Sequence, residues 1–297
     1  MDLKAYLQEQ RALIDAMLDR FLPQESVLPH SIHRAMRYSV FAGGKRLRPV
    51  LVLAACQAVG GDTARALPAA CALEMIHTYS LIHDDLPAMD NDDFRRGNPT
   101  NHKIFGEAVA TLAGDALLTE AFRLLSDPRH VGSCTPAVLL PVIHEIATCA
   151  GSYGMVGGQV VDMESEGRPD IDLATVQYIH THKTGALIKA SVVAGALLGG
   201  AAEQQLAALT RYGEAAGLAF QIADDILDIE GTTEELGKDA GSDQARGKAT
   251  YPAVMGVSSS REEAHAMMDE ALRALEIFGE AAEPLREIAR YVVQRKN

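Results

Sequence analysis

The chain has 297 residues, of which 47% are hydrophobic, 23% are charged and 5% are aromatic, and it contains no Trp. Its formal net charge of −13 argues against nucleic acid as a partner, because binding to a phosphate backbone depends on clustered Lys and Arg. A core made mainly of Ala, Leu, Val, Ile and Met suits close-packed helices.

Helical periodicity recurs from end to end, whereas alternating runs rich in β-branched residues are nearly absent. The sequence therefore predicts an all-α fold, and because no stretch reads as a linker we expect a single domain over residues 1–297. Clusters of Gly, Pro and Asp divide the chain into helical segments of roughly 12 to 25 residues. The expected breaks lie near residues 23–29, 43–44, 60–61, 127–128, 167–169, 199–200 and 231–252.

The N-terminal segment, MDLKAYLQEQRALIDAML, carries charges of both signs and no uninterrupted apolar core. It does not read as a secretory signal, so no processing is expected. The next motif, GGKRLRP, places Lys45, Arg46 and Arg48 directly after a Gly break. Basic residues beside such a break in an acidic chain indicate a loop shaped around an anion, although each one alone could be an ordinary surface charge.

The helix CALEMIHTYSLIHDD is predicted to end at Asp84 and Asp85, because Pro87 prevents its regular continuation. Asp90 returns after the resulting turn, and two adjacent arginines follow. The helix macrodipole disfavours anions at a C-terminus, so carboxylates gathered there indicate a bound cation. Magnesium fits, because it takes oxygen ligands and usually binds one or two carboxylates together with substrate phosphates, whereas the spacing of a calcium loop is missing.

Two features of the middle of the chain point to the core. The stretch ASVVAGALLGGAA from Ala190 falls short of the roughly 18 to 20 residues that span a bilayer, so it is predicted to be a buried helix. The cysteines lie in apolar surroundings without C-x-x-C spacing, which indicates reduced core thiols in a cytoplasmic protein rather than metal ligands or disulfides. They are Cys56, Cys71, Cys134 and Cys149.

The second acidic motif, FQIADDILDIEG, lies on an otherwise apolar helix. At 100° per residue, Asp224, Asp225 and Asp228 fall within an arc of about 100°. This arrangement predicts carboxylates on a cavity wall, whereas an acidic patch facing water would be preferred if the cluster stood alone. Further basic residues beside Gly are Lys183, Lys238 and Lys248. Occurring together with two Asp clusters, they predict a site for a metal-bound diphosphate.

At these motifs the sequence resembles the trans-isoprenyl diphosphate synthases, closest to those of the bacterial farnesyl type. The motifs follow the family order: GGKRLRP, DDLPAMD with RRG, GGQVVD, HKTG, FQIADDILD, GKDAGSD and GKATYP. The resemblance covers nearly the whole chain and implies the isoprenoid synthase fold, a bundle of about ten or more helices around a deep central cavity. It also implies the magnesium-dependent head-to-tail condensation of isopentenyl diphosphate with dimethylallyl and then geranyl diphosphate, giving farnesyl diphosphate and diphosphate.

The resemblance assigns a role to each motif residue. The expected ligands of about three magnesium ions, with manganese as an alternative, are Asp84, Asp85, Asp90, Asp224 and Asp228. The expected allylic diphosphate ligands are Arg95, Lys183, Lys238 and Lys248. The expected isopentenyl diphosphate ligands are Lys45, Arg48, His77 and Arg96. Thr184 and Gln221 are expected to place oxygen dipoles beside the allylic carbocation, near Lys183. The residues expected to brace the site are Gln159 and Asp162.

Some of these residues have ordinary alternatives. A lone His on an apolar helix is usually a core residue, but His77 lies seven positions before Asp84 and on nearly the same face. Thr184 and Gln221 could instead serve helix bending and interhelical hydrogen bonds.

Product length is expected to depend on the fifth and fourth positions before the first Asp, which form the cavity floor in the family. Here they are Tyr79 and Ser80. Ser80 is too small to block a prenyl tail, whereas the ring of Tyr79 could stop it, and the resemblance links an aromatic residue at this position to a farnesyl product. A buried structural role for the ring is the alternative.

Other activities stay open. A geranylgeranyl diphosphate synthase would share every motif. A terpene cyclase would share the fold but replace the second Asp cluster and lack GGKRLRP, and a non-catalytic regulatory subunit of a heteromeric synthase would lose one or both clusters. The family also implies a homodimer. We expect no nucleic acid partner and no stable membrane association.

Overall fold

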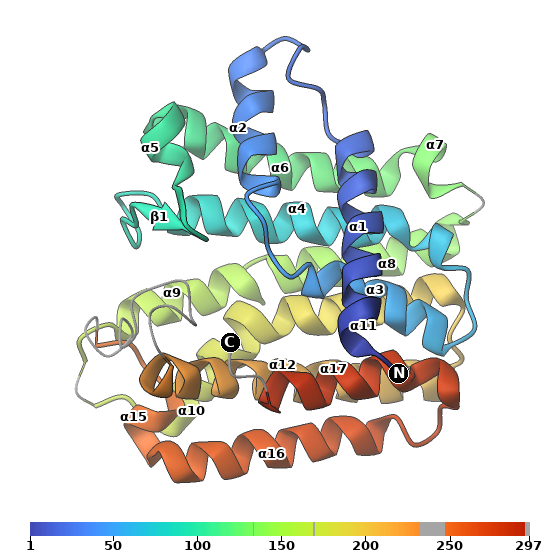
Figure 1. Ribbon diagram of the computed structural model, residues 1–297, viewed down its shortest axis with the longest axis vertical. Coiled ribbons are helices and arrows are strands. Elements are labelled where there is room, and N and C mark those ends of the chain that lie inside the picture. The colour runs from blue at the N-terminus through green and yellow to red at the C-terminus, as the bar shows by residue number, and fades with distance from the viewer. Residues whose placement is uncertain (133, 169, 232–246, 295–297) are drawn as a thin grey trace.

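A computed structural model describes residues 1–132, 134–168, 170–231 and 247–294 (Figure 1). The predicted all-α fold is confirmed. The strands within these ranges form one small hairpin, β1 (Phe94–Arg95) and β2 (Asn98–Pro99). The helices of the first half are α1 (Leu3–Phe21), α2 (His30–Val40), α3 (Leu47–Ala58), α4 (Leu67–Asp84), α5 (Asn101–Phe105), α6 (Glu107–Ser126), α7 (Pro128–Val131) and α8 (Pro136–Ala150).

The second half is also helical. Its helices are α9 (Met155–Ser165), α10 (Leu173–Ile179), a π-helix (His180–Gly185), α11 (Ala186–Gly199), α12 (Glu203–Glu230), α15 (Tyr251–Met255), α16 (Val257–Ala274) and α17 (Glu283–Gln294). Two 3₁₀ turns cover Thr63–Arg65 and Glu280–Ala282.

The predicted range of helix lengths is wrong at both ends. Helix α12 has 28 residues, whereas α5 and α15 have five each. Both short helices end at a Gly with a φ of 81°, Gly106 before α6 and Gly256 before α16. Glycine adopts this left-handed conformation without a steric penalty, so one Gly outside any Gly and Pro cluster is enough to redirect the chain.

The core lies between α3, α4, α11 and α12, with α1 running across α3 and α4 (Figure 1). Helix α11, which contains the apolar stretch from Ala190, is buried along most of its length, as predicted. It packs closely on α3 because Gly195 has no side chain: a Cβ there would lie 2.1 Å from the carbonyl oxygen of Val52. The C-terminal ends of α4 and α12, which carry the two Asp motifs, lie at the same end of the bundle (Figure 1).

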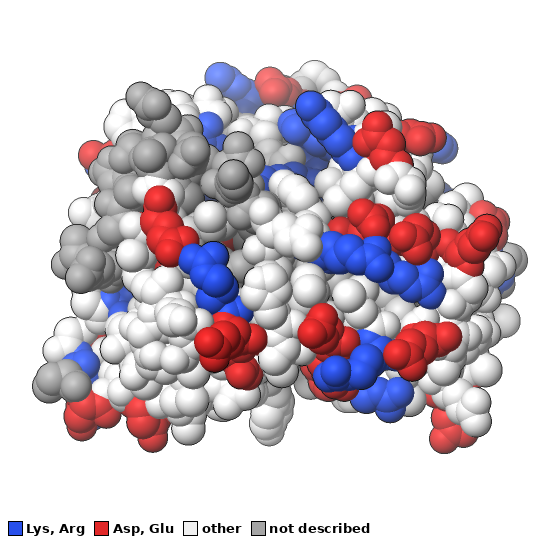
Figure 2. Space-filling model, turned by 60° about the horizontal axis from the view of Figure 1, so that its bottom comes forward, with Lys and Arg blue, Asp and Glu red and all other residues white. Residues whose placement is uncertain are grey.

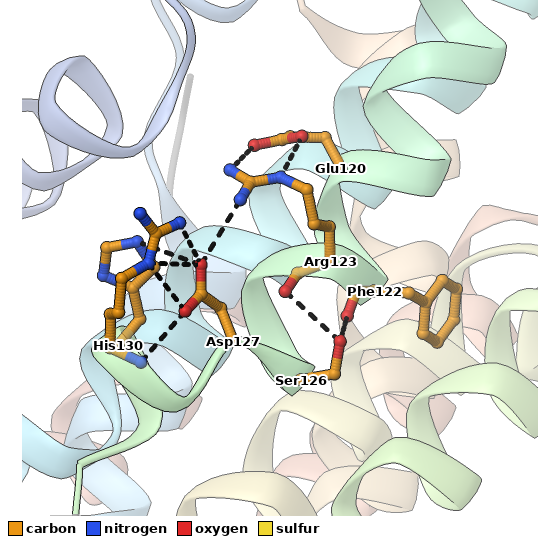
Figure 3. A network of polar contacts seen from close by, with 7 residues as sticks. Glu120, Phe122, Arg123, Ser126, Asp127 and His130 are labelled. Carbon is orange, nitrogen blue, oxygen red and sulfur yellow. Dashed lines mark hydrogen bonds and ion pairs between the residues drawn. The ribbon is translucent and has the colours of Figure 1, made fainter.

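A polar network closes the corner between α6 and α7, where a break was predicted (Figure 3). Asp127 accepts a hydrogen bond from the backbone N–H of Arg129 at 2.9 Å and also pairs with the Arg129 side chain. These hydrogen bonds hold the pKa of Asp127 below its usual range. Arg123 bridges Asp127 and Glu120, so the network caps the start of α7 and ties it to the last turns of α6.

The surface carries charges of both signs, and the cysteines lie in the core. On the face where α16 lies, Lys and Arg side chains alternate with Asp and Glu (Figure 2), and one such pair joins Arg273 to Glu270 at 2.7 Å. All four cysteines are buried and free, and burial raises the pKa of Cys149 to about 12. Among the helices that the structure describes, none combines the length and apolar character that a membrane crossing requires.

Candidate active site

The first Asp cluster lies where the sequence predicts the end of a helix. Helix α4 ends at Asp84, with Asp85 as its C-cap. The backbone N–H of Asp90 then donates a hydrogen bond to the carbonyl oxygen of Asp84 at 2.8 Å. This turn returns the chain to the helix end and brings the third carboxylate beside the first.

Asp85 is paired with Arg95, which lies on β1. The Arg95 Nε donates to both carboxylate oxygens, at 2.8 and 2.9 Å, and its Nη2 donates to Oδ1 at 2.5 Å. Asp85 is only 3% exposed, and burial raises its pKa while Arg95 opposes that shift. The structure thus joins an expected metal ligand to an expected diphosphate ligand in one bidentate pair.

Asp84 lies in a site that favours a cation. Burial, opposed by Lys183 and aided by Asp90, raises the pKa of its carboxyl to about 6. The Lys183 ammonium donates a hydrogen bond to Asp162 at 2.6 Å. Burial alone would lower the pKa of Lys183, but Asp162, Asp84 and Asp90 raise it. The contact between Asp162 and Lys183 is the kind of brace that the Gly-rich motif was expected to supply.

Lys183 is presented by the π-helix, which the sequence does not predict. Such helices occur mostly as single turns at functional sites. Gly158 of α9 makes room for it, since a Cβ at that position would lie 2.2 Å from the backbone nitrogen of Lys183. Thr184 is half-buried in the same turn. Gln159, on α9, has a buried Oε1 without a hydrogen-bond partner among the residues described.

The second Asp cluster is withdrawn from bulk water. Asp228 is 2% exposed and Asp225 is also buried, which excludes the alternative of a solvated acidic patch. Asp224 lines one cavity, whereas Asp225 and Asp228 line another of about 350 Å³. The half-buried Gln221 lies on the same helix, one turn before Asp225. The helix thus presents its carboxylates to two different cavities.

A basic cavity of about 590 Å³ adjoins Asp224. Its wall includes all four expected isopentenyl diphosphate ligands, Lys45, Arg48, His77 and Arg96. The Nε of Arg48 is buried without a hydrogen-bond partner in the described part of the chain, and burial lowers the pKa of this guanidinium to about 10. Burial and the neighbouring Arg48 and Arg96 also lower the pKa of His77, which is therefore neutral at pH 7. The cavity offers concentrated positive charge to an anion.

Arg46 also borders the basic cavity, but its guanidinium is already bound to groups of the protein. Its guanidinium donates to Asp15 at 2.8 Å, to Glu74 at 2.8 Å and to the carbonyl oxygen of Val40 at 2.6 Å. The expectation that all three basic residues of GGKRLRP face an anion is therefore wrong for Arg46. Its left-handed backbone, with a φ of 53°, turns the side chain inward between helices α1, α2 and α4.

We expect Arg46→Met to lower the free energy of unfolding by about 3 to 5 kcal/mol, because Glu74, 2% exposed, would stay buried without its partner. Urea denaturation at pH 7 measures this. The matched control is Arg273→Met, which removes an exposed ion pair with Glu270 and should change the free energy of unfolding far less. Equal losses in the two variants would show that the Arg46 pair is not a structural anchor.

The remaining predicted residues take varied positions. Tyr79 is buried on α4, and burial raises the pKa of its hydroxyl to about 12. Ser80 is half-buried and donates its hydroxyl to the carbonyl oxygen of His77. The Nζ of Lys248 lies 4.0 Å from Asp90 Oδ2. Lys238 lies outside the described residues.

The donor set fits magnesium held together with a diphosphate. Within the described ranges, no three His, Cys, Asp or Glu side chains converge closely enough to hold a metal by themselves. Magnesium usually takes only one or two carboxylates and completes its shell with water and substrate phosphate oxygens. Asp84 at the end of α4 and Asp90 after the following turn supply such a pair, and burial raises the pKa of the Asp84 carboxyl, so a nearby cation would stabilise its ionised form.

Two contact residues were not singled out from the sequence. His180 and Tyr251 both hydrogen-bond to Asp225. Arg168 was also missed and lines the smaller cavity with Asp228 and Lys248. The only signal for them is proximity to the HKTG and GKATYP motifs and to the Gly167 break.

Comparison with known proteins identifies the family. Residues 29–288 match the sequence profile of the family described as polyprenyl synthetase, which is most of the chain. The chain belongs to the polyprenyl synthetase family. The resemblance to trans-isoprenyl diphosphate synthases is thereby confirmed, and the chain is a prenyltransferase of isoprene biosynthesis.

Individual relatives extend over nearly the full chain. The chain is 51% identical over 264 residues to a farnesyl diphosphate synthase of Geobacillus stearothermophilus, covering 88% of this chain and 87% of the relative. It is 48% identical over 296 residues to a geranylgeranyl diphosphate synthase of Cyanophora paradoxa, covering 100% and 97%. The crystal structure of an FPP/GFPP synthase from Zymomonas mobilis matches with a TM-score of 0.87 and 41% identity, covering 98% and 99%. These relatives differ in named product but little in identity, so overall similarity does not decide the product length of this chain.

Proposed function

We propose that this prenyltransferase condenses isopentenyl diphosphate with dimethylallyl and then geranyl diphosphate, releasing diphosphate and giving farnesyl diphosphate as the main product. The observation that carries the farnesyl product is the buried ring of Tyr79, five positions before Asp84 on α4. An aromatic ring there would limit the length of a prenyl tail whose diphosphate is anchored at the end of the same helix.

In this reaction the C–O bond of the allylic diphosphate breaks, the double bond of isopentenyl diphosphate attacks the allylic cation, and a proton is lost. Arg95, Lys183 and Lys248, with Lys238, hold the leaving diphosphate, and Thr184 and Gln221 direct oxygen dipoles towards the cation. The chain needs no nucleophilic side chain. Its part is to fix both diphosphates and to stabilise the charge that develops on the leaving group.

Magnesium, about three ions with substrate bound or manganese in its place, would supply Lewis acidity to the leaving diphosphate. The proposed ligands are Asp84, Asp90 and Asp224, supported by Asp85 and Asp228. Support comes from the oxygen-only donor set and from the pKa of Asp84, which burial raises.

Lys45, Arg48, His77 and Arg96 would bind isopentenyl diphosphate. We expect Lys45→Ala and Arg48→Ala to raise the KM for isopentenyl diphosphate by about tenfold or more and to change the KM for the allylic substrate far less, because each removes a charge-assisted contact from one subsite only. Steady-state kinetics with each substrate varied in turn measures this. Equal effects on both KM values would show that the assignment of these residues to the isopentenyl diphosphate subsite is wrong.

The test of the proposed function uses the purified chain alone, with magnesium and the two diphosphates, and chromatography of the products. Farnesyl diphosphate as the main product is the expected result. Mainly geranylgeranyl diphosphate would favour the second candidate, which the relative from Cyanophora paradoxa supports. No product at all would favour a regulatory subunit, although both Asp clusters of a catalytic chain are present.

We further propose that the chain folds as one domain and acts as a homodimer in the cytoplasm. One large buried cluster includes residues from α1 to α17, which supports a single domain. The reduced state of the buried cysteines supports the compartment. For the dimer, an exposed apolar stripe at helical spacing before and along α9, formed by Tyr153, Val156, Val160 and Met163, offers a surface that a second copy would cover. Light scattering after size-exclusion chromatography tests it.

A further inference from the structure

Asp225 belongs to a buried cluster that ties three separate chain segments together. Its Oδ2 lies 2.7 Å from the His180 Nε2 and 2.9 Å from the backbone nitrogen of Tyr251. The His180 and Tyr251 rings also contact each other, with centroids 5.3 Å apart. All three residues are buried. A carboxylate only accepts hydrogen bonds, so the imidazole Nε2–H and the Tyr251 N–H both donate to the same oxygen.

Each segment in this cluster carries a group proposed to hold the allylic diphosphate or its metal. Lys183 follows His180 by three residues within the π-helix, and Asp224 directly precedes Asp225 on α12. Lys248 precedes Tyr251 by three residues, and its Nζ approaches Asp90 across the site. The cluster therefore sets the spacing between three segments that must act on one ligand.

Asp225 is the only polar anchor that the described structure gives to the His180 ring. The His180 Nδ1 is buried with no hydrogen-bond partner in the ranges described. Loss of the carboxylate would therefore release the ring and also leave the Tyr251 N–H without an acceptor. An unsatisfied buried donor is costly, so the segments would shift to find water or another partner.

We propose that Asp225, together with His180, is a positioning residue that holds Lys183, Asp224 and Lys248 in the arrangement that the magnesium-bound allylic diphosphate requires. This inference rests on the proposed function. It separates the two adjacent carboxylates of the second motif: Asp224 binds the ligand, whereas Asp225 places the segments around it.

The test compares Asp225→Ala, Asp225→Asn and His180→Phe. The Asn side chain keeps an oxygen that can accept both hydrogen bonds, whereas Ala removes it and Phe removes the imidazole donor. We expect Asp225→Ala and His180→Phe to raise the allylic KM by about 10- to 100-fold, as loss of residues that orient ligands does. Asp225→Asn should stay within a few-fold of the wild type. The KM for isopentenyl diphosphate should change little in all three, since its cations lie on other segments.

A binding measurement gives a readout that does not depend on turnover. Calorimetric titration with a thiolo analogue of dimethylallyl diphosphate, in the presence of magnesium, should show the same order of weakening. If Asp225→Ala does not fold, His180→Phe carries the test. The matched control is Asp224→Asn, which should lose binding because a direct ligand needs its charge.

Three results would overturn the inference. If Asp225→Asn is as impaired as Asp225→Ala while His180→Phe binds normally, Asp225 is a metal ligand. If both KM values change together, the cluster serves stability alone. If both Asp225→Ala and His180→Phe bind the analogue as the wild type does, the cluster has no role in the site. These outcomes differ from failure of the proposed function. If the proposed function fails, the wild type gives no product; if only the inference fails, the wild type is active but the variants do not change the allylic KM selectively.

Discussion

Asp84→Ala is expected to lower the rate of prenyl transfer by orders of magnitude and to leave the fold intact. The carboxylate is proposed to share metal with Asp90, and metal acts mainly on charge that develops in the transition state. Each 1.4 kcal/mol of lost stabilisation costs about tenfold in rate. The fold should tolerate the change, because burial raises the pKa of Asp84 to about 6, so the carboxylate that is ionised at pH 7 disfavours the folded state relative to the unfolded chain.

Asp93→Ala is the matched control, because it removes a carboxylate from the same acidic run. The Asp93 side chain is 63% exposed and pairs with Lys103 at 2.6 Å, outside the proposed site. Turnover of this variant should stay close to that of the wild type. Assays at saturating magnesium, with circular dichroism to check folding, measure both. Near-normal turnover of Asp84→Ala, or an equal loss in Asp93→Ala, would contradict the assignment.

The helix ends that depend on local chemistry could be predicted from the sequence. Pro87 stops α4 directly after the paired aspartates, and the break at Asp127 coincides with a side-chain cap. The π-helix could not be predicted in this way. It depends on α9 approaching its backbone at Gly158, a contact between segments more than twenty residues apart, and HKTG reads like any other helical stretch.

The site residues could likewise be named from the sequence, but their partners could not. Arg46 and Arg48 look equivalent in GGKRLRP and both line the basic cavity, yet the Arg46 guanidinium is bound to Glu74, whereas the Arg48 Nε has no hydrogen-bond partner among the described residues. Glu74 lies in the middle of an apolar helix, 28 positions from its partner. Asp225 shares the helical arc of its neighbours, but the His180 and Tyr251 contacts give it a different environment. Such pairings arise from tertiary packing, and the periodicity of a single helix does not predict them.

Tyr79→Ala is expected to shift the main product from farnesyl to geranylgeranyl diphosphate or longer. Tyr79 lies about 7.5 Å back along α4 from Asp84, at 1.5 Å per residue, where a tail anchored at the helix end would reach. Its ring is buried and meets the edge of the His83 ring, with centroids 5.6 Å apart. His83 is itself confined by α6, where Gly114 leaves it room: a Cβ there would lie 2.1 Å from the His83 Nε2. The Tyr79 ring therefore packs against a His83 ring that is itself confined by α6. Removing the Tyr79 ring opens space for a further isoprene unit.

Two variants separate ring size from other effects of the substitution. Tyr79→Phe keeps the ring and should still stop at farnesyl diphosphate, and Ser80→Ala, at the neighbouring small position, should not change the product. Loss of a buried aromatic ring costs about 3 to 5 kcal/mol of folding free energy, so products are compared at low temperature with folding checked. Chromatography of the dephosphorylated products measures chain length. A Tyr79→Ala enzyme that is active but still stops at farnesyl diphosphate would place the cavity floor elsewhere, and a shift in Tyr79→Phe would assign the limit to the hydroxyl, whose pKa burial raises beside Asp84, rather than to the ring.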